Sequence, residues 1–179
     1  AIIVQARMTS TRLPGKILLP VLGRPLLSYQ VERLRRVRLA DAVVIATTTN
    51  ATDDPIVDFC RAEGLAVCRG SEDDVLSRYH FAAREHGVET IVRVTSDCPV
   101  IEPSVIDLAM AAFRESRGTL DYVSNTVERT YPRGLDCEVF SFAALDRAHR
   151  EAEKQQEREH VTPYIYHHPE KFRLGAIRH

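Results

Sequence analysis

A sequence of 179 residues is the size of one domain that can bury a core without disulfide bonds. Apolar residues make up 44% and charged residues 27%, a balance typical of a globular domain rather than of a disordered chain. The formal net charge of -1 excludes a global basic field that would attract nucleic acid, so any anion site must be local. No apolar run approaches the roughly 20 residues of a membrane helix, and the first residues do not resemble a secretory signal. We therefore expect a cytoplasmic protein that binds neither nucleic acid nor a membrane.

The cysteines are spaced widely and irregularly. They are Cys60, Cys68, Cys98 and Cys137, and no two of them form a C-x-x-C pair. A domain of this size does not need disulfide bonds for stability. We therefore expect free thiols, as in a reducing compartment, and no zinc site.

Strand-like and helix-like segments alternate along the first part of the chain. Residues 2–6 are a short apolar run, and apolar residues recur at helical spacing through 25–37. A β-branched run at 42–47 precedes a segment at 53–63 that has a TDDP start at 52–55 and stops at Gly64, as a helix would. The next expected elements are strands at 65–68 and 90–95 and helices at 73–86 and 103–117. This alternation predicts an α/β fold with a mostly parallel sheet covered on both faces.

The pattern changes after Gly118. The elements expected there are strands at 121–124 and 137–142, helices at 142–154 and 157–168, and a last strand at 172–177. Pro163 would begin or kink the second of these helices. We expect a single domain over 1–179, with one part at 1–118 and an appended region at 119–179.

The loop after the first strand, residues 7–16, is rich in cations. Arg7, Arg12 and Lys16 fall within it, hydroxyl side chains lie between the two arginines, and the loop contains no acid. An arginine fork and a lysine point charge suit phosphate oxygens, and ligands of open α/β sheets bind beyond the carboxyl ends of the strands. The loop is not a P-loop, because Ser10 stands where the first glycine would be and Ile17 follows the lysine. It therefore predicts a phosphate site of another kind; the alternative is a solvated basic loop.

A second candidate site follows the strand expected at 90–95. Asp97 would lie at the carboxyl end of that strand, on the same sheet edge as the cationic loop. A single carboxylate there suits Mg²⁺, which binds one or two carboxylates together with substrate phosphates. The alternative is that Asp97 caps the helix that follows.

Five stretches occur in order along the chain. They are QARMTSTRLPGK (5–16), RGSEDDVL (69–76), DCP (97–99), PRGLD (132–136) and REHVTPY (158–164). In these stretches the sequence resembles sugar cytidylyltransferases, with the nearest likeness to the spore-coat polysaccharide biosynthesis branch. That branch is related to the acylneuraminate and 3-deoxy-manno-octulosonate cytidylyltransferases.

The resemblance implies a fold and a reaction. The fold is a three-layer Rossmann-like sandwich of the glycosyltransferase-A and nucleotidyltransferase type. The reaction is Mg²⁺-dependent transfer of CMP from CTP to a sugar, an acidic sugar for a surface polysaccharide, with release of pyrophosphate. Residues 1–118 would then bind the nucleotide and 119–179 would shape the acceptor site. The resemblance is also compatible with a homodimer.

The resemblance also implies roles for particular residues. The nucleotide-binding residues would be Ala6, Arg7, Ser10, Arg12, Lys16, Arg69, Gly70, Ser71 and Asp97. Among these, Arg12, Lys16 and Asp97 would be catalytic, and Asp97 would hold the metal. The acceptor-side residues would be Arg133, Asp136, Glu159 and His160. As alternatives, Glu159 and His160 could begin a helix and Arg133 could be a turn residue.

The sequence departs from the family pattern at two points. Ser96 stands where the family more often has glycine. The family pattern also continues past the position of His179 with a strand and an Asp-Thr-Pro-Glu-Asp segment, whose first aspartate is the expected second metal ligand. We therefore expect either a chain truncated at its C-terminus or a protein without that ligand.

Two other functions remain open at this point. A glycosyltransferase that uses a nucleotide sugar would share the fold, but such enzymes often place two acids around one residue, whereas Asp97 lies between Ser96 and Cys98. A non-catalytic nucleotide-binding subunit is the second alternative, favoured by the missing ligand. The sequence identifies no general base, and His160 is a candidate only because imidazole titrates near neutral pH.

Overall fold

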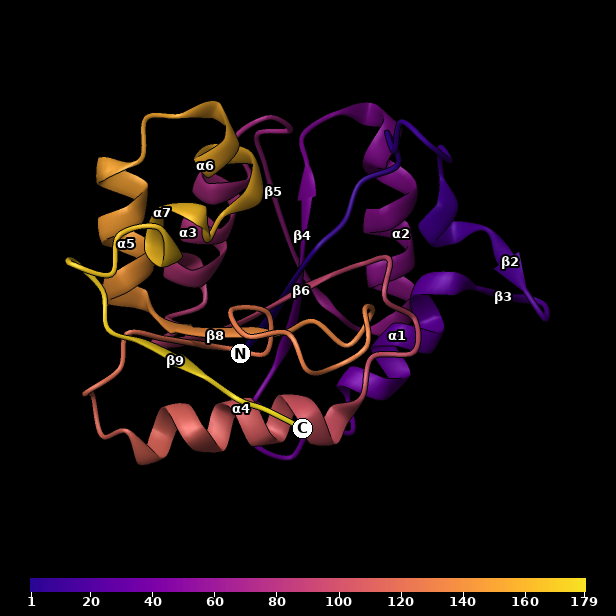
Figure 1. The fold of residues 1–179 in the computed structure, drawn as a ribbon. Coiled ribbons are helices and arrows are strands. Elements are labelled where there is room, and N and C mark those ends of the chain that lie inside the picture. The colour runs from indigo at the N-terminus through magenta and orange to yellow at the C-terminus, as the bar shows by residue number, and fades with distance from the viewer.

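A seven-stranded sheet runs through the middle of the structure, a computed structural model that describes residues 1–179 (Figure 1). The strands lie in the order β5-β4-β1-β6-β8-β7-β9. Their bounds are β1 (Ile2–Gln5), β4 (Val43–Thr48), β5 (Ala66–Gly70), β6 (Thr90–Thr95), β7 (Tyr122–Ser124), β8 (Glu138–Ser141) and β9 (Leu174–Ala176). Neighbouring strands are parallel, except that β8 runs antiparallel to β6 and to β7. The predicted α/β fold with a mostly parallel sheet is therefore confirmed.

Helices cover both faces of the sheet, which is the middle of three layers (Figure 1). They are α1 (Leu26–Leu34), α2 (Asp54–Glu63), α3 (Val75–Glu85), α4 (Pro103–Glu115), α5 (Phe142–Glu151), α6 (Gln155–His160) and α7 (Pro163–Tyr166), together with the short 3-10 helices η1 (Lys16–Leu18) and η2 (Ala51–Asp53). None of these helices has the length and the apolar character needed to cross a membrane.

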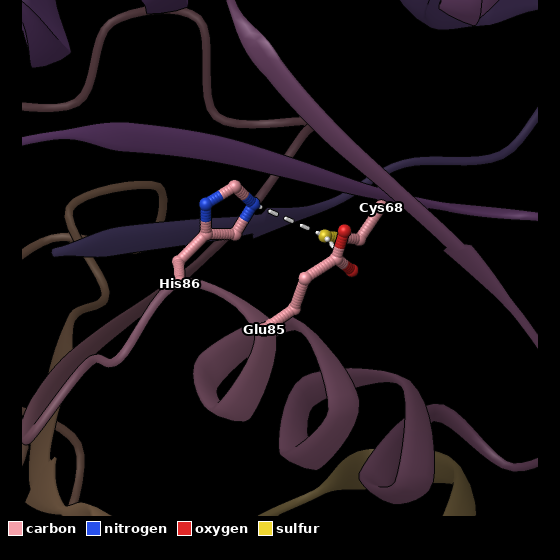
Figure 2. A group of neighbouring side chains, drawn as sticks. All are labelled: Cys68, Glu85 and His86. Carbon is pink, nitrogen blue, oxygen red and sulfur yellow. Dashed lines mark hydrogen bonds between the residues drawn. The ribbon is translucent and has the colours of Figure 1, made fainter.

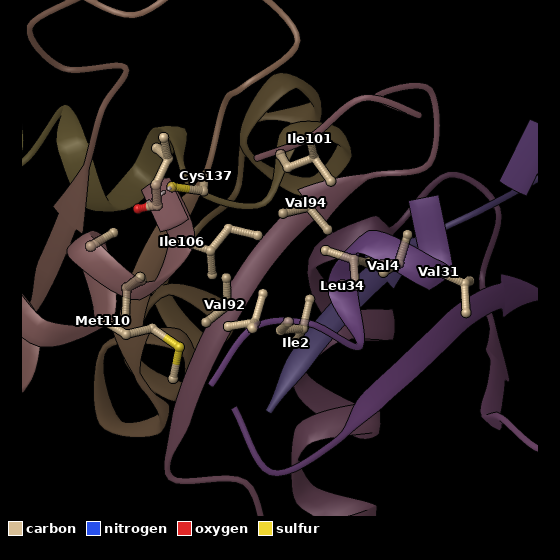
Figure 3. Packing of buried hydrophobic residues seen from close by; sticks show 14 of the residues in the cluster. Ile2, Val4, Val31, Leu34, Val92, Val94, Ile101, Ile106, Met110 and Cys137 are labelled. Carbon is tan, nitrogen blue, oxygen red and sulfur yellow. Dashed lines mark hydrogen bonds between the residues drawn. The ribbon is translucent and has the colours of Figure 1, made fainter. Parts of the chain in front are cut away.

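The alternation of side chains along β1 divides the buried residues into two cores. Ile2 and Val4 belong to a cluster of 23 buried residues that includes side chains of α1, α2 and α4 (Figure 3). Ile3 belongs to a cluster of 21 buried residues on the other face, with side chains of α3, α5 and α7. Successive strand residues point to opposite faces, so a strand buried on both sides is apolar throughout. Because β1 is held from both faces, the loop after it starts from a fixed point.

A small hairpin before α1 was not expected from the sequence. It consists of β2 (Pro20–Val21) and β3 (Arg24–Pro25), and it projects away from the sheet (Figure 1). The turn residues Leu22 and Gly23 have φ angles of 49° and 79°, as a type I′ turn requires. Strands of two residues are too short to show the alternation that identifies a strand.

The helix expected at 157–168 is two helices in the structure. Helix α6 ends at His160, α7 begins at Pro163, and Val161 between them has a φ angle of 73°. Pro163 begins α7, which is one of the two roles expected for it.

Candidate active site

The loops after β1 and β6 open on the same edge of the sheet, as expected. These strands are parallel neighbours, and their last residues, Gln5 and Thr95, lie side by side in the register. Between the two loops lies a cavity of about 340 Å³, which we call the nucleotide cavity after the ligand expected from the sequence. Its size falls within the range of small-molecule sites. The expected site residues that line it are Ala6, Arg7, Ser10, Arg12, Lys16, Asp97, Glu159 and His160.

Two hydrogen bonds donated by backbone N–H groups fix the conformation of the cationic loop. The N–H of Gly15 donates to the carbonyl of Met8 at 2.8 Å, and the φ angle of Gly15 is 70°, which favours glycine. The N–H of Met8 donates to the Asp53 carboxylate at 2.7 Å. Asp53 is fully buried and also accepts hydrogen bonds from Thr47 and Thr48. The sequence predicted only a helix start at residue 53, so this anchor of the loop was missed.

Cations outnumber carboxylates around the nucleotide cavity. Its charged side chains, apart from His160, are Arg7, Arg12, Lys16 and Arg78 against Asp97 and Glu159. Lys16 Nζ lies 2.8 Å from Asp97 Oδ2, and Arg7 Nη1 lies 3.6 Å from Glu72 Oε1. A polyanion with several phosphates would complement this excess of positive charge.

Arg78 is the cation that the sequence did not reveal. Only 2% of its surface is exposed, its Nε has no hydrogen-bond partner, and Nη1 donates to the carbonyl of Ser71 at 3.2 Å. Burial lowers the pKa of the Arg78 guanidinium. Helical spacing contained a usable signal, because Val75 and Ala82 lie three and four residues away on the buried face of α3. A charged residue on that face needs a partner, and an anion in the cavity would supply one.

Asp97 carries the features of a metal ligand. Burial raises the pKa of its carboxyl, but hydrogen bonds from Lys16 and Thr95 outweigh that effect and hold the pKa below its usual range. The side chain is 41% exposed and faces the cavity, so an ionised oxygen is available to a cation. One ionised carboxylate beside the expected phosphate site would suit Mg²⁺, which takes oxygen ligands and shares them with substrate phosphates.

The segment at 69–71 supports the cavity from outside its wall. The guanidinium of Arg69 donates to the carbonyls of Thr48 and Asn50 at 2.7 and 2.8 Å and pairs with Asp54 at 2.8 Å. A Cβ added to Gly70 would lie 3.3 Å from Arg78 Cγ, so a residue without a side chain lets Arg78 pack closely. The structure therefore does not bring Arg69, Gly70 and Ser71 to the cavity wall with the other expected residues.

A second cavity of about 550 Å³ adjoins the first. We call it the acceptor cavity, after the acceptor-side residues expected from the sequence. The residues common to both walls are Thr95 and His160. Of the expected acceptor-side residues, Asp136 and His160 line this cavity, whereas Glu159 faces the nucleotide cavity. Arg133 lines neither cavity and is exposed in a turn.

The charged side chains of the acceptor cavity occur as ion pairs. Arg129 contacts both oxygens of Asp136, at 2.7 and 3.1 Å. Arg93 on β6 pairs with Glu138 on β8, and Glu138 also accepts hydrogen bonds from Tyr122 and Thr162. The pairing of distant strands that brings Arg93 and Glu138 together could not be recognised from either segment alone.

A comparison with known families shows which family the chain belongs to. The family described as Cytidylyltransferase matches residues 1–179. The chain belongs to the cytidylyltransferase family.

Relatives of this cytidylyltransferase extend over nearly the whole chain. The spore coat polysaccharide biosynthesis protein SpsF of Bacillus subtilis is 36% identical over 98% of this chain and 73% of its own length. A solved cytidylyltransferase from Leptospira borgpetersenii serovar Hardjo-bovis is 36% identical, with a TM-score of 0.95, over 99% of this chain and 75% of that chain. The solved structure of CMP:2-keto-3-deoxy-manno-octonic acid synthetase complexed with CTP has a TM-score of 0.76 at 17% identity, over 99% of this chain and 88% of that chain. At that identity the likeness shows the fold alone.

Outside the cavities, Cys68 forms a small polar cluster with Glu85 and His86 (Figure 2). The thiol donates to Glu85 at 3.2 Å and lies 3.3 Å from Nε2 of His86. Burial, reinforced by Glu85, raises the pKa of the Cys68 thiol to about 12. A neutral thiol that donates a hydrogen bond accounts for the short distances. The cluster joins the C-terminus of α3 to β5, at the opposite end of that helix from Arg78.

Proposed function

We propose that this protein transfers CMP from CTP to a hydroxyl group of a sugar and releases pyrophosphate, with Mg²⁺ as cofactor. The observation that carries the proposal is the nucleotide cavity, which four cations line together with the ionised carboxylate of Asp97, in a chain of the cytidylyltransferase family. Membership of the cytidylyltransferase family supports the choice of nucleotide, and the spore coat relative supports a polysaccharide sugar. The name of the CTP-bound relative favours an acidic sugar.

Different groups of the cavity contact different parts of the bound CTP. Arg7, Arg12 and Lys16, with the hydroxyl of Ser10, contact phosphate oxygens, while the backbone near Ala6 meets the base and ribose. Mg²⁺ held by Asp97 would neutralise charge on the phosphates and orient them. The side chains of Arg12 and Lys16 offset the charge that grows on the pyrophosphate as it leaves, which is electrostatic stabilisation of the transition state.

Arg78 belongs to the same assignment. Arg78 lines the nucleotide cavity and its Nε is unpaired, and we assign a bound nucleotide oxygen as an acceptor for this guanidinium. Arg69, Gly70 and Ser71 then act indirectly, by fixing the position of this guanidinium from behind.

The acceptor sugar occupies the acceptor cavity. Its ion pairs, Arg93 with Glu138 and Arg129 with Asp136, offer both donors and acceptors to sugar hydroxyls. Residues 1–118 supply most of the nucleotide cavity, and residues 119–179 supply most of the acceptor cavity.

The test is an assay of pyrophosphate release. The protein is incubated with Mg²⁺ and each of CTP, UTP, ATP and GTP, together with a panel of 2-keto sugar acids and neutral sugars. We expect release with CTP and one class of sugar, and a loss of roughly 10²–10³-fold in Lys16→Ala and in Asp97→Asn. Arg61→Ala is the control, because Arg61 forms an exposed ion pair on α2 away from both cavities.

The same assay separates the alternatives. Normal turnover in both Lys16→Ala and Asp97→Asn would refute the assigned site. Release of CDP from a CDP-sugar, with no pyrophosphate from CTP, would identify a glycosyltransferase. Tight CTP binding without turnover against the whole panel would identify a non-catalytic subunit.

A further inference from the structure

We infer that His160 is the general base that deprotonates the acceptor sugar, and that a strained turn at Val161 positions it. This inference rests on the proposed function and assigns the proton acceptor of that reaction. The attacking hydroxyl must lie in the acceptor cavity while the α-phosphorus lies in the nucleotide cavity. The two reacting atoms therefore meet where the cavities share a wall.

The wall that the two cavities share limits which residue can act as the general base. Of the described residues, Thr95 and His160 line both cavities. The hydroxyl of Thr95 contacts Cys98 and Asp97, and an alcohol does not accept a proton at neutral pH. An imidazole does, which makes His160 the group at the junction able to take the hydroxyl proton.

The backbone after His160 adopts a rare conformation. Val161 has φ of 73° and ψ of -57°, and the N–H of Thr162 donates to the carbonyl of His160 at 2.9 Å. These angles and this bond define a γ-turn of the strained kind, which is unusual for a β-branched residue. Such strain persists only where the surrounding structure enforces it, and it is often found at functional sites.

Contacts on both sides enforce the turn. Val161 is fully buried in the core beneath α3, α5 and α7, and the hydroxyl of Thr162 donates to Glu138 at 2.6 Å. On the other side, Arg158 holds both carboxylate oxygens of Asp74, the residue that caps α3, at 2.5 and 3.1 Å. Helix α6 therefore ends at His160, and the chain turns before α7 begins. This turn leaves His160 at the corner between the two cavities.

The proton and electron movements balance without another reactant. A nitrogen of His160 takes the hydroxyl proton as the sugar oxygen forms its bond to the α-phosphorus. The bond from that phosphorus to the oxygen bridging to the β-phosphorus breaks, and its electron pair leaves with pyrophosphate. The imidazolium then returns its proton to solvent.

The experiment compares His160→Ala with wild type, using CTP and the sugar that gives the highest rate in the panel. We expect kcat to fall by roughly 10²–10⁴-fold, with little change in the KM for CTP. Added imidazole should restore part of the lost kcat by entering the space left by the side chain. His167→Ala, an exposed histidine of neither cavity, is the matched control and should behave as wild type in both conditions.

The outcomes distinguish this inference from the proposed function. If the wild type releases no pyrophosphate with any sugar, the proposed function fails first. If the wild type is active and His160→Ala retains its kcat, the base assignment is wrong while the function stands. A loss of kcat that imidazole does not restore would also overturn the assignment, because it would leave His160 a binding or structural role.

Discussion

The buried guanidinium of Arg78 leads to a prediction in which stability and binding change in opposite directions. In the free protein its Nε is unpaired, and an unsatisfied buried donor costs about 1–3 kcal/mol. Arg78→Met removes that cost and the buried charge, but it deprives the Ser71 carbonyl of a bond that, at 3.2 Å, lies at the long end of the N–H···O range and is worth about 0.5–1.5 kcal/mol. The free energy of unfolding of the free variant should therefore be unchanged or should rise by up to about 2 kcal/mol.

Nucleotide binding should weaken in the same variant. A hydrogen bond from a charged donor is worth about 1.5–3 kcal/mol, which corresponds to roughly 10–100-fold in affinity. At a CTP concentration of 100 times the wild-type Kd, the wild type gains about 2.7 kcal/mol of stability. A variant with 100-fold weaker binding gains only about 0.4 kcal/mol under the same conditions.

Urea unfolding with and without CTP measures both quantities. Arg84→Met is the control, because Arg84 is exposed on the same helix and lines neither cavity. The reasoning would be refuted by an Arg78→Met protein that is clearly less stable than wild type when free and that keeps the full gain from CTP. That result would make Arg78 a structural cation held by its neighbours.

Two further predictions concern the supports of the site. Val161→Gly should lower the free energy of unfolding by about 1–3 kcal/mol less than Val123→Gly does. Both valines are buried, but only at Val161 does glycine relieve a positive φ angle. Equal losses of unfolding free energy in urea would argue against stored strain. Burial raises the pKa of Asp74, but hydrogen bonds from Arg158 and from the Ser77 N–H outweigh it and hold that pKa below its usual range. The folded-state pKa therefore lies below the unfolded value near 3.9, so the contribution of Asp74 is present above that pH and is lost as the pH falls through the folded-state pKa. In Asp74→Asn the free energy of unfolding, measured from pH 7 downward, should fall less steeply below about pH 4, and parallel curves for the two proteins would contradict this.

Local patterns were sufficient to predict the framework of the nucleotide cavity. The cations at Arg7, Arg12 and Lys16 lie close together in the sequence, and the parallel strands that carry this loop and Asp97 are visible as apolar runs. Since the carboxyl ends of parallel strands share one sheet edge, those residues converge for a topological reason.

Residues whose role depends on tertiary burial were not predicted. Asp53 was expected only as a helix start, and Arg78 was not among the expected site residues, because burial of a charge is decided by elements far along the chain. Arg69 was expected at the site from its motif, whereas in the structure its guanidinium donates to Thr48 and Asn50 and does not line the nucleotide cavity. The acceptor cavity was still harder to predict, because the Arg93–Glu138 pair joins strands that only the folded sheet brings together.

The narrow border between the two cavities bears on how such proteins can diversify. Thr95 and His160 are the residues common to the two walls, so under the proposed function most positions that would contact the sugar would not contact the nucleotide. Substitutions at Arg129, Asp136 or Val127 can alter one wall while the cationic loop keeps its shape. Selection for a new sugar can therefore proceed through the C-terminal part of the chain without loss of the donor nucleotide, provided that the corner at Val161 is kept.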